Sequence, residues 1–268
     1  MIDYVLYHDN CIDGFGAAFA AWLWLGESAV YIPVRHYEPL PQLPQAGKVY
    51  ILDFCYREPV LNELESLCEN FIVLDHHVGN MECLSTDYLN SHENVIFDTG
   101  RSGATLTWIY FHGYDVPIFF KYIEDYDLWR LKMPHVDEFN IALSQLDRTF
   151  EAWESVYYGD PEGVTSLITT GRAIIKYRDG LVCDIVRSMF VQTLDGVSFP
   201  AVYAPSHLAN EVCTKLIKDT GMPMAGVCYG KDYNSWSIRG DGRFDCAEFA
   251  RRFGGNGHTN SAGFKITD

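Results

Sequence analysis

Short apolar runs alternate with helix-length segments through the first half of the chain. The segments 14–25 and 59–68 are predicted helices, and the apolar runs that predict strands cover residues 4–7, 30–34, 49–52, 71–74 and 95–97. Continuous apolar runs of this length suit strands that are covered on both faces. Because strands that alternate with helices form βαβ units, residues 1–135 predict an α/β domain with a doubly wound parallel sheet.

The pattern changes in the second half of the chain. Leucine, isoleucine and alanine recur at helical spacing, which predicts a helical connector over 136–194. Strand-like runs return at 197–203, 225–229 and 235–238, with a predicted helix at 207–218. We therefore expect a smaller mixed α/β domain over 195–268.

Charge and cysteine usage limit the class of protein. The 268 residues carry a net charge of −16, from 20 Lys and Arg against 36 Asp and Glu. A protein that grips long duplex DNA neutralises many phosphates, so such a partner is not expected, whereas short anionic ligands and metal ions fit. The eight cysteines form no C-x-x-C pair, and we interpret them as reduced thiols of a cytoplasmic protein. The longest apolar run, Ala17–Leu25, is far shorter than a membrane-spanning helix, so no membrane partner is expected.

Metal-binding residue types follow three of the predicted strands. His8 follows the first strand, Asp53 the third, and Asp75, His76 and His77 the fourth. In an open parallel sheet, ligands bind beyond the carboxyl ends of the strands. Mixed Asp and His ligands suit Mn²⁺, Fe²⁺ or Zn²⁺ better than Ca²⁺ or Mg²⁺. The alternative is that an Asp after a strand only caps a helix or forms a turn. This alternative is weaker for Asp53, because two other strand ends offer it partner ligands.

The order of these motifs resembles the DHH phosphoesterase superfamily. The resemblance rests on His8–Gly14, on the strand-end Asp53, on Asp75–His77, and on Glu124–Asp127, which offers two acidic candidates. At the C-terminus, Gly255–Gly263 reads G-N-G-H-T-N-S-A-G, similar to the G-G-G-H-x-x-A-A-G pattern of the DHH-associated domain. The motifs span most of the chain, so the resemblance concerns both predicted domains.

The resemblance implies two Mn²⁺ ions. It assigns the metal ligands to His8 and Asp13 for one ion, Asp53 as the bridge, and His76 with Asp125, or else Asp127, for the other. Many members carry two carboxylates in the first motif, whereas this chain has only Asp13, with Asn10 as a neutral substitute. One metal position is therefore expected to be weaker.

The resemblance also implies catalytic and substrate-binding roles. Beyond the bridging Asp53, His77 would contact the scissile phosphate, and Asp75 would orient the histidines. Phosphate would be bound by the C-terminal domain and by the start of a predicted helix, and the candidate residues are Arg239, Gly255, Gly257, His258 and Ser102. The alternative for Ser102 is that it is an ordinary helix cap. The glycines could form an anion-binding nest of backbone amides, and the alternative is that they form a simple turn.

The sequence thus predicts a Mn²⁺-dependent phosphohydrolase or phosphodiesterase that acts on short nucleotides. Dinucleotides, short oligoribonucleotides and a nucleoside 3′,5′-bisphosphate are the expected substrates. Cyclic mononucleotide or dinucleotide hydrolysis and polyphosphate hydrolysis remain open alternatives, as does a nucleotide-binding sensor with a weakened metal site. The oligomeric state stays open, a homodimer included.

Overall fold

The computed structural model describes residues 1–35, 38–159 and 162–266. The chain divides into two compact units, residues 1–174 and 175–268, and the division falls inside helix α9 (Glu162–Val186). Each unit has its own sheet and its own buried core.

Unit 1 is built on a five-stranded parallel sheet. Its strands are β1 (Ile2–His8), β2 (Ala29–Val34), β3 (Ala46–Leu52), β4 (Cys68–Asp75) and β5 (Val95–Phe97). Their order is β2-β1-β3-β4-β5, and every neighbouring pair is parallel. The predicted α/β class with a doubly wound parallel sheet is confirmed, as are all five predicted strands.

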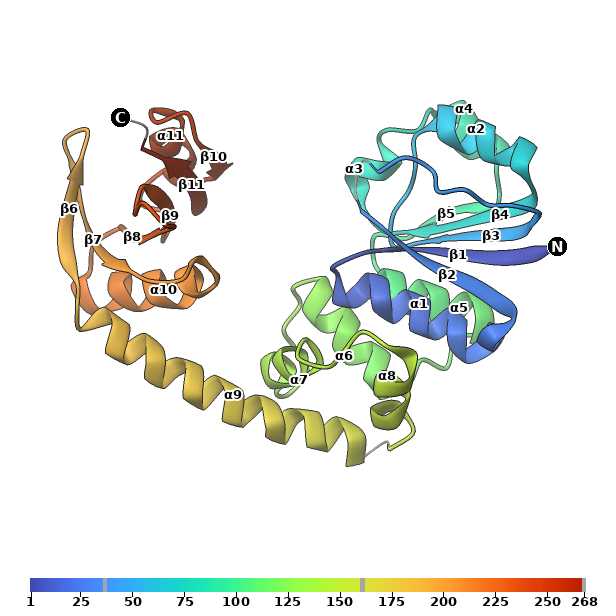
Figure 1. Ribbon diagram of the computed structural model, residues 1–268, viewed down its shortest axis with the longest axis horizontal. Helices are drawn as coiled ribbons and strands as arrows, with labels where there is room; N and C mark the ends of the chain where they lie inside the picture. The colour runs from blue at the N-terminus through green and yellow to red at the C-terminus, as the bar shows by residue number, and fades with distance from the viewer. Residues whose placement is uncertain (36–37, 160–161, 267–268) are drawn as a thin grey trace. The chain divides into compact units, whose positions relative to one another are not determined.

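Helices cover both faces of this sheet (Figure 1). Helices α1 (Ile12–Leu25) and α5 (Gly103–His112) pack on one face, and α2 (Glu58–Leu67) and α4 (Thr86–Ser91) pack on the other, with the one-turn helix α3 (Val78–Met81) after β4. Alternate strand residues face opposite layers, so Val5 contacts the α1 layer while Tyr4 and Leu6 contact the α2 layer. Both faces are buried, which explains the continuous apolar runs.

The strand order places a crevice at one edge of the sheet. The chain passes from β1 to β2 on one side and then crosses to β3 on the other side of β1. Ligands of doubly wound sheets bind at such a switch point, beyond the carboxyl ends of the two strands. His8 ends β1 and Asp53 directly follows β3, so both lie at this crevice.

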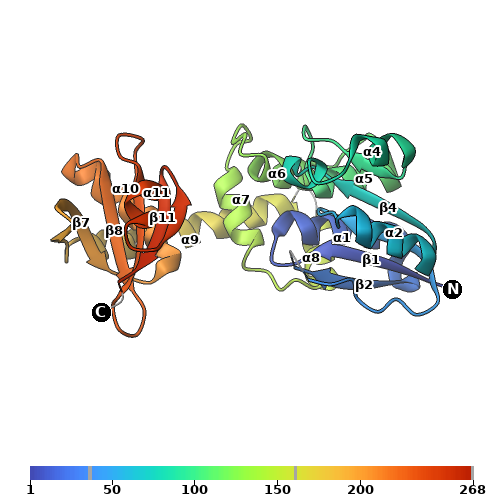
Figure 2. The same ribbon diagram turned by 90° about the horizontal axis from the view of Figure 1, so that it is seen from above.

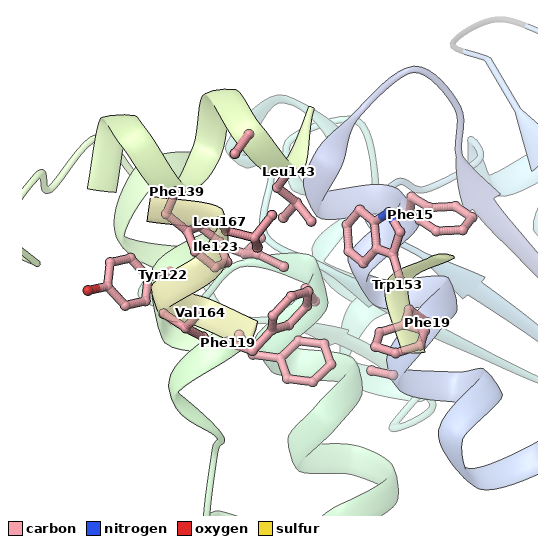
Figure 3. Packing of buried hydrophobic residues seen from close by; sticks show 14 of the residues in the cluster. Phe15, Phe19, Phe119, Tyr122, Ile123, Phe139, Leu143, Trp153, Val164 and Leu167 are labelled. Carbon is pink, nitrogen blue, oxygen red and sulfur yellow. The ribbon is translucent and has the colours of Figure 1, made fainter. Parts of the chain in front are cut away.

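Further helices build an aromatic core against α1 and α5. They are α6 (Ile118–Asp127), α7 (Val136–Leu143), α8 (Phe150–Tyr157) and the first part of α9, with α6 and α7 adjacent in both views (Figures 1 and 2). Figure 3 shows Phe15, Phe19 and Trp153 pointing toward one another, with ring centroids 4.8 and 5.8 Å from that of Trp153. Residues 136–194 therefore do not form the separate helical connector that the sequence predicted. Much of this segment belongs to the core of unit 1, and its last five residues form a strand of unit 2.

Unit 2 contains a six-stranded mixed sheet of order β10-β11-β9-β8-β7-β6. The strands are β6 (Phe190–Leu194), β7 (Val197–Tyr203), β8 (Met224–Tyr229), β9 (Ser235–Gly240), β10 (Asn256–His258) and β11 (Ser261–Lys265). Helices α10 (Ala209–Thr220) and α11 (Cys246–Arg251) pack against separate apolar clusters of the sheet. Short 3₁₀ turns occur at Gly26–Ser28 and Ser206–Leu208. Within the described part of the chain, every helix is too short or too polar to cross a membrane.

Candidate metal centre

Asp53 stands at the centre of a buried cluster in unit 1. Its side chain is fully buried, with Oδ2 3.5 Å from His8 Nδ1 and Oδ1 3.1 Å from His76 Nε2. Burial alone would raise the pKa of Asp53, but the neighbouring imidazoles outweigh burial and hold that pKa below its ordinary value. The carboxylate therefore stays ionised between two imidazoles.

The backbone around the cluster leaves no room for larger residues. Asp53 has φ of 64°, a left-handed conformation that glycine adopts freely and that asparagine and aspartate tolerate better than most other residues. A Cβ on Gly103 would lie 2.6 Å from the Cβ of Asp53, and a Cβ on Gly14 would collide with the carbonyl oxygen of His8. The two glycines thus let α5 and α1 approach the strand ends that carry these ligands.

A second group forms around His76. Its Nε2 lies 3.7 Å from Asp13 Oδ2 and 3.6 Å from Asp127 Oδ2. Asp13 accepts hydrogen bonds from the first amides of α5, at 2.6 Å from Gly103 N and 3.1 Å from Ala104 N. Burial raises the pKa of Asp13, and the carboxylates of Asp53 and Asp127 raise it further. Three crowded carboxylates of this kind favour a cation among them.

Asp75 holds the two histidines that follow it. Its Oδ1 accepts from the backbone amide of His76 at 2.7 Å and from His77 Nδ1 at 2.8 Å, while Oδ2 accepts from Asn80 Nδ2 at 2.8 Å. Because a carboxylate only accepts, Nδ1 of His77 carries the proton. This hydrogen bond to Asp75, opposed by burial, raises the pKa of His77 to about 9. The hydrogen bond to Asp75 therefore favours the protonated form of His77 in the metal-free protein.

These side chains fit a divalent metal centre. Potential ligand atoms within 4.8 Å of one another form three overlapping groups: His8, Cys11 and Asp53; Asp13, His76 and Asp127; and Asp53, Asp75, His76 and His77. Both oxygens of Asp53 and Nε2 of His76 are buried, yet none makes a hydrogen bond to another described residue. Buried polar atoms normally have a partner. Nitrogen and oxygen donors in this arrangement are suited to divalent metal ions.

The structure brings Asp127, rather than Asp125, to this cluster. Asp125 Oδ2 instead accepts from the amides of Lys132 and Met133, at 2.8 and 2.9 Å, and so orders the loop after α6. The sequence favoured Asp125 as the acidic neighbour of His76, with Asp127 as the alternative, and the structure corrects this choice to Asp127. Helical geometry explains the outcome, because residues two apart point to different sides of α6.

Substitutions at these two positions should separate the two roles. Asp127→Ala is expected to weaken Mn²⁺ binding with little loss of stability. Asp125→Ala should lower stability by about 1–3 kcal/mol, because two partly buried loop amides lose their acceptor, while metal binding is retained. Denaturant unfolding and Mn²⁺ titration of both variants test this, and the reverse pattern would restore Asp125 as the ligand.

Two further expectations are also corrected. Ser102 is fully buried, and its hydroxyl caps α5 by accepting from Thr105 N, so it is not available to a substrate. The amides at the start of α5 already hold Asp13, so this helix end is not a free anion site. Asn10 accepts a hydrogen bond from the Arg148 guanidinium at 3.5 Å.

The sequence interpretation missed Cys11. The structure groups its thiol with His8 and Asp53, whereas Asp13, expected beside His8, falls in the group of His76 and Asp127. A usable signal was present in the sequence. Cys11 lies two residues before Asp13, within the motif that was short of one acidic ligand.

In unit 2, Arg239 and His258 lie in one row across the sheet. Arg239 on β9 pairs with Ser261 on β11, which pairs with His258 on β10. Residues directly opposite in neighbouring strands share a face, so the three side chains lie on the same side. The row brings two of the expected phosphate ligands together.

The glycines of this segment have a packing role. Gly255 N donates to Ala250 O at 2.9 Å, and Gly257 N donates to the Asn256 side chain at 2.8 Å. A Cβ on Gly255 would collide with the carbonyl oxygen of Gly263. These amides are used within the protein, so the expected anion-binding nest is corrected to a tightly packed hairpin.

A pocket of about 520 Å³ opens beside the strand ends of unit 1. Its wall includes Phe54 and Tyr56, which follow Asp53, as well as Arg57 and Asn80. Asn80 also donates to Asp75, so the pocket wall and the histidine motif are directly connected. The volume lies within the usual range of small-molecule sites.

Comparisons with known proteins agree with this architecture. No family model matches the chain. The uncharacterized protein R106 of Acanthamoeba polyphaga mimivirus is 28% identical over 290 residues, covering 99% of this chain and 68% of that protein. Among solved structures, the pGpG-specific phosphodiesterase PggH from Vibrio cholerae is 11% identical, with 100% of this chain and 94% of that chain covered and a TM-score of 0.55. RecJ from Thermus thermophilus in complex with Mn²⁺ is 13% identical, with 99% and 49% covered and a TM-score of 0.47. The chain therefore shares its fold with the pGpG-specific phosphodiesterase PggH.

Proposed function

We propose that the protein is a metal-dependent phosphohydrolase that cleaves short nucleotide substrates with the help of two divalent metal ions, at least one of them Mn²⁺. The observation that carries the proposal is the buried cluster around Asp53. His8 and Cys11 lie on one side of that carboxylate, and His76 with its acidic neighbours lies on the other. Such a shared carboxylate is the arrangement that two adjacent ions require.

The residues divide the chemistry among them. When bound, two divalent ions activate a water molecule and neutralise charge on the phosphoryl oxygens. His77, oriented by its hydrogen bond to Asp75, would donate from its other ring nitrogen to the scissile phosphate or its leaving oxygen. Asp75 is a positioning residue, because it is fully buried and acts through the histidines.

Several features favour a short substrate. The net charge of −16 disfavours a long nucleic acid held along a basic surface. The pocket beside the cluster offers the half-buried ring of Tyr56 for a base and the exposed Arg57 for a phosphate. PggH, whose fold the chain shares, is a pGpG-specific phosphodiesterase, so a 5′-phosphorylated dinucleotide is the first substrate to test.

Product analysis with a substrate panel tests the proposal. The protein would be incubated with Mn²⁺ and a 5′-phosphorylated diribonucleotide, a short oligoribonucleotide and a nucleoside 3′,5′-bisphosphate. Cyclic nucleotides, pyrophosphate and polyphosphate complete the panel and cover the alternative substrates. Turnover of one class establishes the hydrolase and names its substrate. Binding of metal and nucleotide with no turnover of any member would contradict hydrolysis and select the sensor function.

The row of Arg239 and His258 is expected to bind the terminal phosphate. Arg239→Ala should raise KM for phosphate-terminated substrates roughly ten- to a hundredfold with a smaller effect on kcat, because one charged hydrogen bond is lost. Arg239→Lys serves as the control, since it keeps the charge without the planar guanidinium. This role would be refuted if removal of the terminal phosphate from the substrate left KM unchanged in the wild-type protein and in Arg239→Ala alike.

A further inference from the structure

Cys11 stands where the chain enters α1, but its thiol does not cap that helix. Helices usually begin with Ser, Thr, Asp or Asn, whose side-chain oxygens accept from the first amides. Here the backbone carbonyl of Cys11 accepts from Phe15 N at 3.2 Å. The sulfur lies within 4.8 Å of a ring nitrogen of His8 and a carboxylate oxygen of Asp53. The sulfur thus lies beside the metal cluster.

The ligand atoms of Cys11, His8 and Asp53 lie within 4.8 Å of one another, which is close to the spacing found in metal sites. Nitrogen and sulfur ligands bind Zn²⁺ at about 2.0–2.3 Å, so two ligands of one ion lie no more than about 4.6 Å apart. An independent observation comes from Asp53. Its side chain is fully buried, and neither carboxylate oxygen accepts a hydrogen bond from the residues that the structure describes. A buried carboxylate of this kind needs a cation.

The two halves of the cluster offer different donors. Asp13, His76 and Asp127 provide oxygen and nitrogen alone, which suit Mn²⁺. The other half adds the sulfur of Cys11, and thiolate ligands favour softer ions such as Zn²⁺, Co²⁺ and Fe²⁺. Exchange of an acidic ligand for a thiolate therefore alters which metal is preferred.

We infer that Cys11 is a thiolate ligand of the metal position that it shares with His8 and Asp53, and that this position takes a softer ion than its neighbour. The inference rests on the proposed function only for the presence of two metal positions. Binding releases the thiol proton to solvent and forms a metal–sulfur bond without oxidation of the cysteine.

Cobalt spectroscopy tests the inference directly. The full chain, stripped of metal with a chelator, would be titrated with Co²⁺, whose bonds to thiolates give an intense near-ultraviolet charge-transfer band. We expect the band to saturate at one equivalent per chain and to disappear in Cys11→Ser and in Cys11→Asp. Cys68→Ser is the matched control, because Cys68 is also half-buried at a helix end but donates to Leu64 O. That variant should keep the band.

Competition experiments give a second readout. Cys11→Asp is expected to retain two equivalents of Co²⁺ in equilibrium dialysis while its preference for Zn²⁺ over Mn²⁺ falls at least about tenfold. A wild-type protein that binds no Co²⁺, or binds it without the band, would overturn the inference, as would a band that survives in Cys11→Ser. If the wild-type protein shows the band but hydrolyses no substrate, only the proposed function is refuted. If it hydrolyses a substrate but shows no band, only the thiolate ligand is refuted.

Discussion

Asp53→Asn is expected to abolish Mn²⁺-dependent hydrolysis and to weaken metal binding by more than about 100-fold. Loss of a residue that only supports a ligand costs about 10- to 100-fold in affinity or activity, so loss of the shared ligand should cost more. Asparagine is the informative replacement, because it keeps the size of the side chain and tolerates the φ of 64° at this position. The expected defect then reflects the lost charge and not a distorted backbone.

Thermal unfolding with and without Mn²⁺ separates binding from folding in this variant. A ligand that binds the folded state raises Tm, so Mn²⁺ should stabilise the wild-type protein and leave the Asp53→Asn protein unchanged. Asp98→Asn is the matched control, since Asp98 also follows a strand but is exposed and accepts from Gly100 N. Hydrolysis within tenfold of wild type in Asp53→Asn would contradict the two-ion centre.

Gly103→Ala should impair the centre without touching any ligand. The added methyl group would lie 2.6 Å from both Cβ and Oδ1 of Asp53, so either Asp53 or the start of α5 must move. Overpacking of a buried site costs about 1–3 kcal/mol of stability. The same movement disturbs the amide of residue 103 that holds Asp13, so metal affinity should fall together with stability.

Gly180→Ala is the matched control for Gly103→Ala, because the same added methyl group is expected to raise stability here and not to lower it. Gly180 lies in α9 and is exposed, and a methyl group added to its Cα would meet no atom within 4 Å outside its own helix backbone. Alanine there should stabilise the helix by up to about 1 kcal/mol and leave Mn²⁺ binding unchanged. Chemical denaturation and Mn²⁺ titration of both variants check the pair. A Gly103→Ala protein with normal affinity would show that the close approach of α5 does not position Asp53.

The sequence was sufficient for the sheet and for most of the cluster. Period and length of the apolar runs predict buried parallel strands, and the carboxyl ends of such strands meet at one edge. His8, Asp53 and His76 each stand at a strand end, so strand assignment alone brings them together. The predicted role of Asp75 as an orienting residue also agrees with its buried hydrogen bonds, although its effect on activity stays a prediction.

Residues on helices and loops could not be assigned in the same way. Asp125 and Asp127 share one turn of α6, and only the rotation of that helix against the sheet directs Asp127 to His76. The hydroxyl of Ser102 and the backbone amide of Gly255 are suited to binding an anion. In the folded protein, however, both groups form hydrogen bonds within the chain, with Thr105 N and Ala250 O.

The sequence by itself determined the α/β class, the strand ends and the residue types that gather there, because those follow from local periodicity and residue chemistry. Tertiary structure decided which side chains belong to each half of the cluster. It paired Cys11 with His8 and Asp53, and it turned Asp13 toward His76 through the amides of α5. Such choices depend on helix rotation and on long-range hydrogen bonds, which no local pattern encodes.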